Sequence, residues 1–253
     1  MYHSISAVAN ESAAGYFGTT TSPSRFEEQM RFLHENGYST LSLEEVQHRL
    51  ANSSDQTRPV VITFDDGFED FYTDAFPILE QYGFSATMFL PTGYIGNSNL
   101  KFKDKFCLSW GQVCELSAIG QRFGSHTVSH PQLRQIIPAD RIRELQESKN
   151  GIEQALGKPV NSFSYPYAFP EQDRQFVREL RQDLSECGYT NGVSTIVGRA
   201  SASDDPFFFK RLPINDGDDC ELFRAKLEGG YDWLHPLQYA TKLIRSEIQN
   251  WQQ

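Results

Sequence analysis

The segment Val60-Val61-Ile62-Thr63-Phe64 constrains the fold more than any other part of the sequence. Its residues are β-branched or aromatic and lack polar alternation, which is typical of a parallel strand covered by helices on both faces. A segment with helical spacing of apolar residues follows it, and then a second apolar strand at residues 86–90. This order predicts a βαβ unit, in which neighbouring strands are parallel.

Strand-like and helical segments continue to alternate along the chain. Glycines end several helical patterns, as expected where a helix needs a residue of positive φ. Six or seven alternations favour a closed or nearly closed (β/α) barrel over an open sheet. The other predicted strands lie at residues 2–8, near 41, and at 122–125, 162–165, 192–197 and 207–214; the helices lie at about 26–36, 42–50, 71–82, 141–156, 176–187 and 234–251.

Composition narrows the classes of function. A chain of 253 residues with 39% hydrophobic residues is long enough for one α/β barrel. The net charge of −10 argues against nucleic acid and against electrostatic docking to membranes. No apolar run reaches the roughly 18 residues of a membrane span, and the first residues do not resemble a signal peptide, so we expect a cytoplasmic protein. The oligomeric state stays open.

The four cysteines show no CxxC motif and no regular spacing. We therefore expect free thiols at Cys107, Cys114, Cys187 and Cys220 rather than a disulfide framework.

Asp65-Asp66-Gly67 follows the central predicted strand directly. Parallel sheets bind ligands beyond the carboxyl ends of their strands, so two carboxylates here indicate a site. The alternative is a simple turn, because Asp bonds to its own backbone and Gly accepts positive φ.

His126 and His130 follow another predicted strand at a spacing of four residues. Surface histidines are common, so this pair alone is a weak signal. One Asp and two His, with positions left for water, commonly hold a catalytic zinc or a similar ion. The two motifs together predict such a site, in which the second Asp is free to act as a base.

These motifs resemble the polysaccharide deacetylase family, which includes chitin, peptidoglycan and poly-N-acetylglucosamine deacetylases. Thr63-Phe64-Asp65-Asp66-Gly67 and Ser125-His126-Thr127-Val128-Ser129-His130 match its first two motifs, and the similarity spans residues 2–214. The resemblance implies a distorted (β/α) barrel with about seven parallel strands. It implies a single catalytic domain over 1–253, with a core at about 1–215 and a helical extension at about 216–253. It also implies Asp65 as the base and Asp66, His126 and His130 as metal ligands.

The third motif of the family departs from the usual pattern. Ser164-Tyr165-Pro166-Tyr167 has serine where the family has the arginine that pairs with the catalytic Asp. Arg211, on a late predicted strand, is the candidate replacement; the alternative is a solvated charge at a strand edge. Tyr167, with its backbone amide, and Tyr165 are predicted to contact the oxyanion or the substrate.

The general acid is predicted to be His3, because Tyr2-His3 resembles the end of an N-terminal strand in poly-N-acetylglucosamine deacetylases. His235 in Asp232-Trp233-Leu234-His235 is the alternative, unless this segment only anchors the last helix.

The loops offer further candidates for substrate contacts. Aromatic side chains could stack on sugars, although most are expected in the core; the candidates are Phe68, Tyr94, Trp110, Tyr165 and Tyr167. Residues 95–108 carry Lys101, Lys103 and Lys105, and a solvated loop is the favoured interpretation.

The sequence thus predicts a metal-dependent hydrolase that removes the N-acetyl group of a sugar or glycan precursor. The expected metal is Zn²⁺, with Co²⁺, Ni²⁺ or Mn²⁺ as alternatives. Two other functions stay open. One is hydrolysis of another C–N bond, by a deformylase or a cyclic ureide or imide hydrolase. The other is a non-catalytic glycan-binding barrel.

Overall fold

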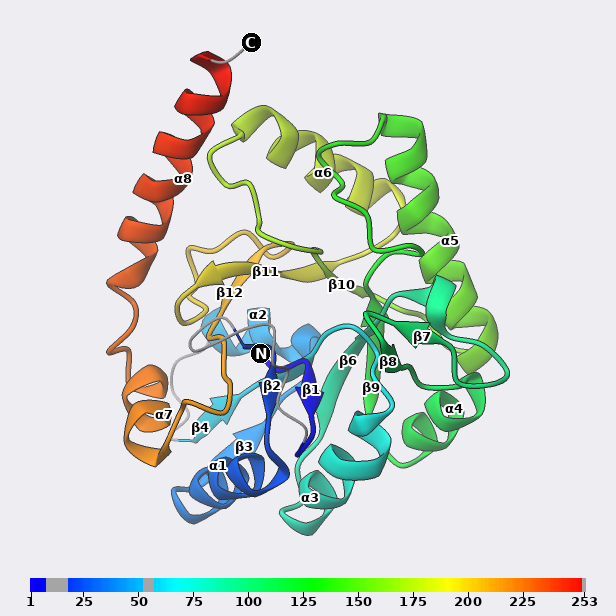
Figure 1. The fold of residues 1–253 in the computed structure, drawn as a ribbon, viewed down its shortest axis with the longest axis vertical. Helices are drawn as coiled ribbons and strands as arrows, with labels where there is room; N and C mark the ends of the chain where they lie inside the picture. The colour runs from blue at the N-terminus through cyan, green and yellow to red at the C-terminus, as the bar shows by residue number, and fades with distance from the viewer. Residues whose placement is uncertain (8–17, 52–56, 252–253) are drawn as a thin grey trace.

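A six-stranded parallel sheet, curled into a half-barrel, forms the centre of the molecule (Figure 1). The computed structural model describes residues 1–7, 18–51 and 57–251, and side chains up to residue 242. The strand order is β12-β11-β10-β9-β6-β5. The bounds are β5 Ile62–Phe64, β6 Ala86–Leu90, β9 Arg122–Ser125, β10 Ser162–Ser164, β11 Asn191–Val197 and β12 Phe209–Arg211. This arrangement confirms the predicted barrel-like α/β fold, with six strands in the continuous sheet.

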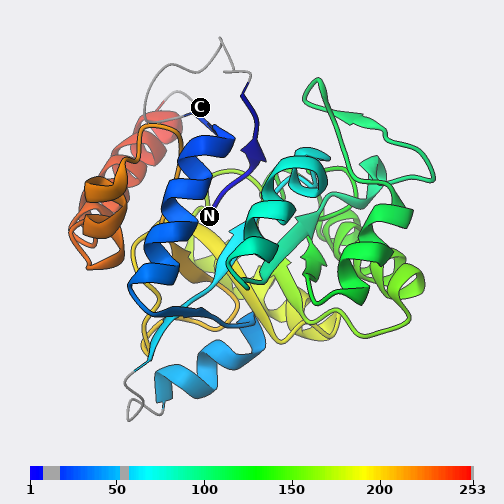
Figure 2. The same cartoon turned by 90° about the horizontal axis from the view of Figure 1, so that it is seen from below.

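Helices surround the sheet. Figure 2 shows α1, in blue, between the orange α7 and the cyan α3. The helices are α1 Pro23–Glu35, α2 Leu43–Ala51, α3 Phe76–Gln81, α4 Trp110–Ala118, α5 Pro138–Leu156, α6 Arg174–Glu186, α7 Cys220–Leu227 and α8 Leu234–Trp251. The shorter strands are β1 Ser4–Ile5, β2 Thr20–Thr21, β3 Tyr38–Thr40, β4 Arg58–Val60, β7 Lys101–Phe102 and β8 Lys105–Phe106.

Residues Met1 and Tyr2 bridge the open side of the half-barrel. Tyr2 lies beside β5, and Met1 lies against the segment after β12. The hydrogen bonds run from Tyr2 N to Thr63 O (2.8 Å), Asp65 N to Tyr2 O (3.1 Å), Met1 N to Leu212 O (2.9 Å) and Ile214 N to Met1 O (3.0 Å). This segment therefore takes the place of a further strand, and it delivers His3 to the rim where Asp65 lies.

The main apolar core lies between the strands and the helices on the side of β5. The ring of Phe64 packs against Tyr2 at 5.3 Å and against Phe71 at 4.8 Å between ring centroids. Phe64 points into this core, so the next residue of the alternating strand, Asp65, faces the barrel interior at the strand end. Packing of the apolar residue thus fixes the direction of the carboxylate.

Some predicted element bounds need correction. The strand expected near Leu41 is β3, which ends at Thr40, and α5 begins at Pro138 rather than near residue 141. Helix α7 was not predicted. Residue 8 of the first predicted strand lies outside the described residues. All four cysteines are free, as expected.

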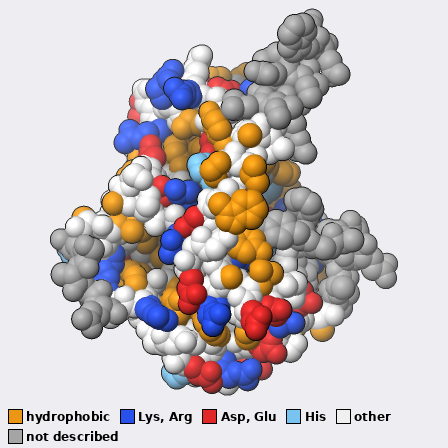
Figure 3. Space-filling model, turned by 90° about the vertical axis from the view of Figure 1, so that its left-hand side faces the viewer, with side chains coloured by type: hydrophobic (Ala, Val, Ile, Leu, Met, Phe, Trp, Pro, Cys, Tyr) orange, Lys and Arg blue, Asp and Glu red, His pale blue; other side chains and the backbone are white. Residues whose placement is uncertain are grey.

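The face that carries α7 and α8 shows hydrophobic side chains interrupted by charges of both signs (Figure 3). Trp233 and Leu237, four residues apart at the start of α8, are exposed there. In the described part of the chain, no helix combines the length and the apolar character that crossing a membrane requires.

The backbone around Gly192 of β11 is packed too tightly to leave room for a side chain. A Cβ atom at this position would overlap the carbonyl oxygen of Phe207 and lie 2.9 Å from that of Phe163. Since backbone cannot move away cheaply, we expect Gly192→Ala to lower the free energy of unfolding by about 2–3 kcal/mol in urea titrations. Gly151→Ala is the matched control: no atom lies within 4 Å of its Cβ, and it lies inside α5, so it should stabilise by about 0.5–1 kcal/mol. Equal effects would contradict the packing argument.

Candidate metal centre

Three ligand-type side chains converge at the carboxyl ends of β5 and β9. Asp66 follows β5, while His126 and His130 lie in the loop after β9. Oδ1 of Asp66 lies 3.4 Å from Nε2 of His130 and 3.8 Å from Nε2 of His126. All three residues are buried, and their ligand atoms lie within 4.8 Å of one another. The structure thus brings together the three residues that the sequence predicts as metal ligands.

The donor set fits a divalent ion. Nδ1 of His126 lies 2.7 Å from the carbonyl oxygen of Ser164, so this nitrogen carries the proton and Nε2 presents a lone pair. Burial is the main cause that lowers the pKa of His130, to about 3, and this keeps its ring neutral. Oδ1 of Asp66 is buried and has no hydrogen-bond partner in the described structure. A bound cation would compensate the buried charge of this carboxylate oxygen, and the two imidazoles that face the oxygen would complete its set of ligands.

Backbone strain gathers at this centre. Four non-glycine residues in the loops after β5, β9 and β10 have positive φ: Asp66 (73°), Thr127 (68°), His130 (56°) and Tyr167 (61°). This region costs an L-residue roughly 1–2 kcal/mol, and a β-branched threonine adopts it rarely. Strain of this kind persists where the surrounding structure holds it, and it marks functional sites. The backbone conformation therefore helps to orient the two candidate ligands Asp66 and His130.

Glu144 of α5 binds the loop that carries His126 and His130. Its Oε2 accepts the backbone N–H groups of Val128 and Ser129, both at 2.8 Å, and its Oε1 accepts the Ser129 hydroxyl at 2.7 Å. Within the loop, the Thr127 hydroxyl accepts the backbone N–H of His130 at 3.0 Å. The sequence does not predict this role of Glu144, because one acidic residue on a helix carries no signal of a contact with a distant loop.

Arg211 binds the carboxylate of Asp65 through two parallel hydrogen bonds. Nη1 donates to Oδ1 at 2.9 Å and Nη2 donates to Oδ2 at 2.8 Å. The remaining donors are also used: Nε binds Ser194 O (2.9 Å), Nη1 binds Thr63 Oγ1 (3.3 Å) and Nη2 binds Ser164 Oγ (3.1 Å). All five N–H groups of the guanidinium thus have acceptors. With Arg211 only 7% exposed, the alternative of a solvated charge at a strand edge is wrong.

Ser164 makes this pairing possible. Its small side chain stands where the family arginine was expected, and its hydroxyl donates to Oδ1 of Asp65 at 3.2 Å. Burial alone would raise the pKa of Asp65, but the charge and the hydrogen bonds of the Arg211 guanidinium outweigh it and hold that pKa well below its usual range. Asp65 is therefore an ionised carboxylate at any ordinary pH.

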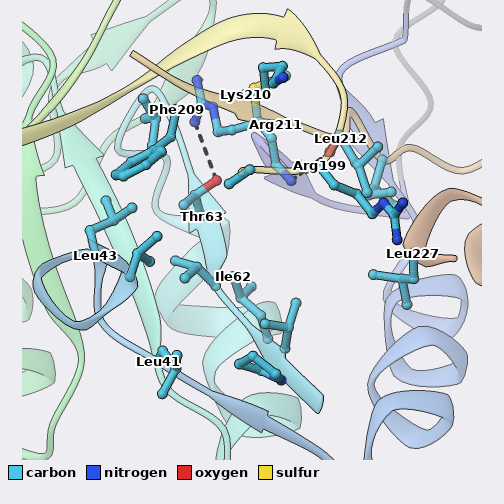
Figure 4. A pocket seen from close by; sticks show the side chains of 18 of the residues that line it. Leu41, Leu43, Ile62, Thr63, Arg199, Phe209, Lys210, Arg211, Leu212 and Leu227 are labelled. Carbon is cyan, nitrogen blue, oxygen red and sulfur yellow. Dashed lines mark hydrogen bonds between the residues drawn. The ribbon is translucent and has the colours of Figure 1, made fainter. Parts of the chain in front are cut away.

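A cavity of about 380 Å³ lies beside Arg211, bounded by β5, β12 and α2 (Figure 4). Most of its lining is aliphatic, and Figure 4 shows Arg211 donating to Thr63 at one end of it. Asp65, Asp66, His126 and His130 do not line it. The cavity is thus distinct from the candidate metal centre, although Arg211 borders both.

His3 and His235 lie in different surroundings. Burial lowers the pKa of His3, and the charges on Asp66 and Asp65 oppose this shift. His3 directly follows Tyr2, whose carbonyl accepts the backbone N–H of Asp65 at 3.1 Å. His235 Nε2 lies 2.7 Å from Oε2 of Glu171, whose other oxygen accepts Lys242 Nζ at 2.8 Å. His235 therefore ties α8 to the loop after β10, which is the anchoring role considered for it.

The predicted aromatic contacts divide between core and rim. Tyr165 is only 3% exposed and packs on Phe169 and Phe176, so its ring belongs to the core; the prediction of a substrate contact for this side chain is corrected. Tyr167 is 49% exposed, and its ring lies edge-on to His130 at 4.6 Å between centroids. Of the two tyrosines, only Tyr167 offers its side chain to a ligand. Trp110 begins α4, and Phe68 is buried in the core.

Lys103 was interpreted as part of a solvated loop, and the structure corrects this. Its ammonium donates to Oδ2 of Asp66 at 2.9 Å. The surrounding segment forms the hairpin of β7 and β8, which lies against the site.

The chain is similar to known proteins both in sequence and in fold. The sequence pattern of the family described as polysaccharide deacetylase matches residues 52–192. A Bacillus subtilis relative named as a polysaccharide deacetylase is 30% identical over 229 residues, which are 90% of this chain and 75% of that protein. Poly-β-1,6-N-acetyl-D-glucosamine N-deacetylase of Staphylococcus aureus is 26% identical over 206 residues, covering 78% of this chain and 68% of the relative. The solved Streptococcus pyogenes deacetylase PplD, in complex with acetate, has a TM-score of 0.78 at 29% identity and covers 90% of this chain and 96% of its own.

Proposed function

Because the chain belongs to the polysaccharide deacetylase family, we propose that it is a metal-dependent hydrolase that removes the N-acetyl group from an N-acetylated sugar of a glycan. The observation that carries the proposal is the buried set of Asp66, His126 and His130 directly beside an aspartate held by an arginine. Amide hydrolysis needs a nucleophilic water, a base and a group that stabilises the oxyanion. The site offers a residue for each task.

Asp66, His126 and His130 would hold the ion, most simply Zn²⁺, although Co²⁺, Ni²⁺ or Mn²⁺ suit the same ligands. A divalent ion supplies Lewis acidity, which polarises a carbonyl and lowers the pKa of a coordinated water from about 15.7 to about 7. Asp65 accepts the proton of the attacking water. Arg211 fixes both oxygens of Asp65 in place and keeps the carboxylate ionised until that proton arrives.

The oxyanion and the leaving amine need their own partners. The backbone N–H of Tyr167, in a segment held at positive φ, is the proposed oxyanion donor. His3, which follows the pairing of Tyr2 with β5 beside Asp65, is the proposed acid that protonates the departing sugar amine. The half-exposed ring of Tyr167 offers a face on which a sugar can stack.

An N-acetylated glycan is the substrate class that the relatives support. The Staphylococcus aureus relative is named for poly-β-1,6-N-acetyl-D-glucosamine. The serine in the third motif had left room for hydrolysis of another C–N bond. Arg211 supplies the guanidinium that the motif lacks, which supports the hydrolysis of an N-acetyl group over that alternative. A non-catalytic barrel would not need four buried, converging polar groups at one rim.

Metal content and acetate release test the proposal together. We expect about one zinc or similar ion per wild-type chain by mass spectrometry, and acetate release from an N-acetylglucosamine oligomer. His130→Ala removes a ligand and should lose both the ion and the activity. His34→Ala, which changes a histidine on α1 away from the site, should keep both. Wild-type protein that takes up no zinc, cobalt or nickel on reconstitution would defeat the proposal, and formate instead of acetate would assign the site to another C–N bond.

A further inference from the structure

The hairpin of β7 and β8 places a lysine in an unusual backbone conformation. Its two-residue turn is Lys103-Asp104, with φ of 50° and 62°. Two successive positive φ angles are the geometry of a type I′ turn, which strongly favours Asn, Asp or Gly. A lysine at the first of these positions is uncommon, and strain next to a functional site points to a role for the side chain.

The side chain of Lys103 reaches one particular oxygen of Asp66. Its ammonium donates to Oδ2 at 2.9 Å, whereas Oδ1 of the same carboxylate faces Nε2 of His130 and Nε2 of His126. Asp66 is buried, while the Lys103 side chain is 47% exposed. The two oxygens therefore have separate surroundings: one faces the metal ligands and the other is bound by a cation from the rim.

The hairpin itself is anchored, so the backbone at Lys103 is held near Asp66. Phe102 packs against Tyr94 at 4.4 Å and against His130 at 5.1 Å between ring centroids. The next lysine, Lys105, donates to the hydroxyls of Ser4 and Thr20. The backbone N–H of Glu69 binds the carbonyl of Phe106 at 2.9 Å. Side chain and backbone thus hold the turn over Asp66.

We propose that Lys103 is a positioning residue that occupies Oδ2 of Asp66 and so keeps this carboxylate a one-oxygen ligand of the metal. A free carboxylate can bind a cation through one oxygen or both. Binding through both would take a coordination position that water or the substrate carbonyl needs. Outer partners that orient a ligand in this way affect metal sites strongly. This inference rests on the proposed metal-dependent function and deepens it.

Cobalt substitution tests the proposal without relying on activity alone. The visible absorption of bound Co²⁺ is more intense at low coordination number than at high coordination number. Lys103→Asn removes the ammonium but suits the type I′ turn, so the hairpin should fold normally. We expect weaker absorption per bound cobalt in this variant, and turnover at saturating cobalt lower by about 10–100-fold. Lys103→Arg, which can still donate to Oδ2, should recover the wild-type spectrum.

Lys101→Asn is the matched control. It removes a lysine of the same hairpin whose ammonium lies over the Phe106 ring at 4.9 Å, and it should leave spectrum and turnover unchanged. A Lys103→Asn spectrum identical to that of the wild type would overturn the inference, because Lys103 would then leave Asp66 when the ion binds. Tighter cobalt binding with an unchanged spectrum would also overturn it and would make Lys103 a mere competitor of the ion. If the wild type itself binds no cobalt, the proposed function fails, and this inference fails with it.

Discussion

Asp65→Asn is expected to lower kcat by about 10³-fold while leaving about one metal ion per chain. The amide has nearly the shape of the carboxylate but cannot accept the proton of the attacking water. The ligands Asp66, His126 and His130 are not altered, so the metal content should not change. Acetate release measured at saturating metal, together with metal analysis of the same sample, checks both halves of this expectation.

The stability of Asp65→Asn must be measured as well, because the variant leaves Arg211 with a neutral partner. Circular dichroism and urea unfolding show whether activity is lost because the base is missing or because the variant is unfolded. Asp66→Asn offers a useful contrast, since it should lose metal as well as activity. If Asp65→Asn keeps a tenth or more of the wild-type kcat, the base is another group and the assignment of roles to the two aspartates is wrong.

Arg211→Gln is expected to lower the free energy of unfolding by about 3–5 kcal/mol. The reason is that Asp65 stays buried with its charge and loses both of its parallel hydrogen bonds. Lysine cannot substitute fully, because it has three donors and no planar fork where all five guanidinium N–H groups are used. Urea titrations of Arg211→Gln and Arg211→Lys at pH 7 measure the loss. The double variant Asp65→Asn/Arg211→Gln should be more stable than Arg211→Gln, because it no longer buries an unpaired charge.

The pH dependence of this destabilisation has a definite sign. In the wild type, the folded pKa of Asp65 lies below the unfolded value of about 3.9, so the pair contributes fully above that pH and its contribution is lost as the pH falls further. In Arg211→Gln, burial is no longer opposed by the guanidinium, and the pKa of Asp65 should rise. Protonation then removes the unpaired charge, so the stability gap between the two proteins should narrow from pH 7 to pH 4. A gap that widens over this range would contradict the assigned pairing.

Local patterns in the sequence predicted most of the strands and the grouping of the candidate ligands at one rim. The apolar run ending at Phe64 predicts one strand, which the structure divides into β4, ending at Val60, and β5, Ile62–Phe64, and it predicts the direction of Asp65. Asp66 and the two histidines meet because parallel strands end at one rim. Arg211 could be predicted as the partner of Asp65 because it lies on a strand of the same barrel. In each case a residue at or near the end of a predicted strand lies at the site, because the strands of the sheet are parallel and their ends meet.

Other residues could not be predicted because their roles depend on segments that fold over the site. Lys103 lies on a hairpin and Glu144 on a helix, and neither periodicity nor spacing shows which loop they contact. Only one proline separates Tyr165 from Tyr167 in the sequence, yet the ring of Tyr165 enters the core and the ring of Tyr167 faces outward. Residues with positive φ change the direction in which the following side chains point. Such residues can be predicted from a sequence only where they are Gly, Asn or Asp.

The bridge formed by Met1 and Tyr2 has a consequence for folding kinetics. The hydrogen bond from Met1 to Leu212 joins residues separated by 211 positions, and Tyr2 pairs with β5 in the same short segment. Contacts of such long range require a large loop to close before they add stability, so they form slowly. During synthesis, the contacts of Met1 with Leu212 and Ile214 cannot form until β12 and the residues after it have been made. The bridge that closes the half-barrel next to His3 would therefore be completed late, after Tyr2 can already pair with β5.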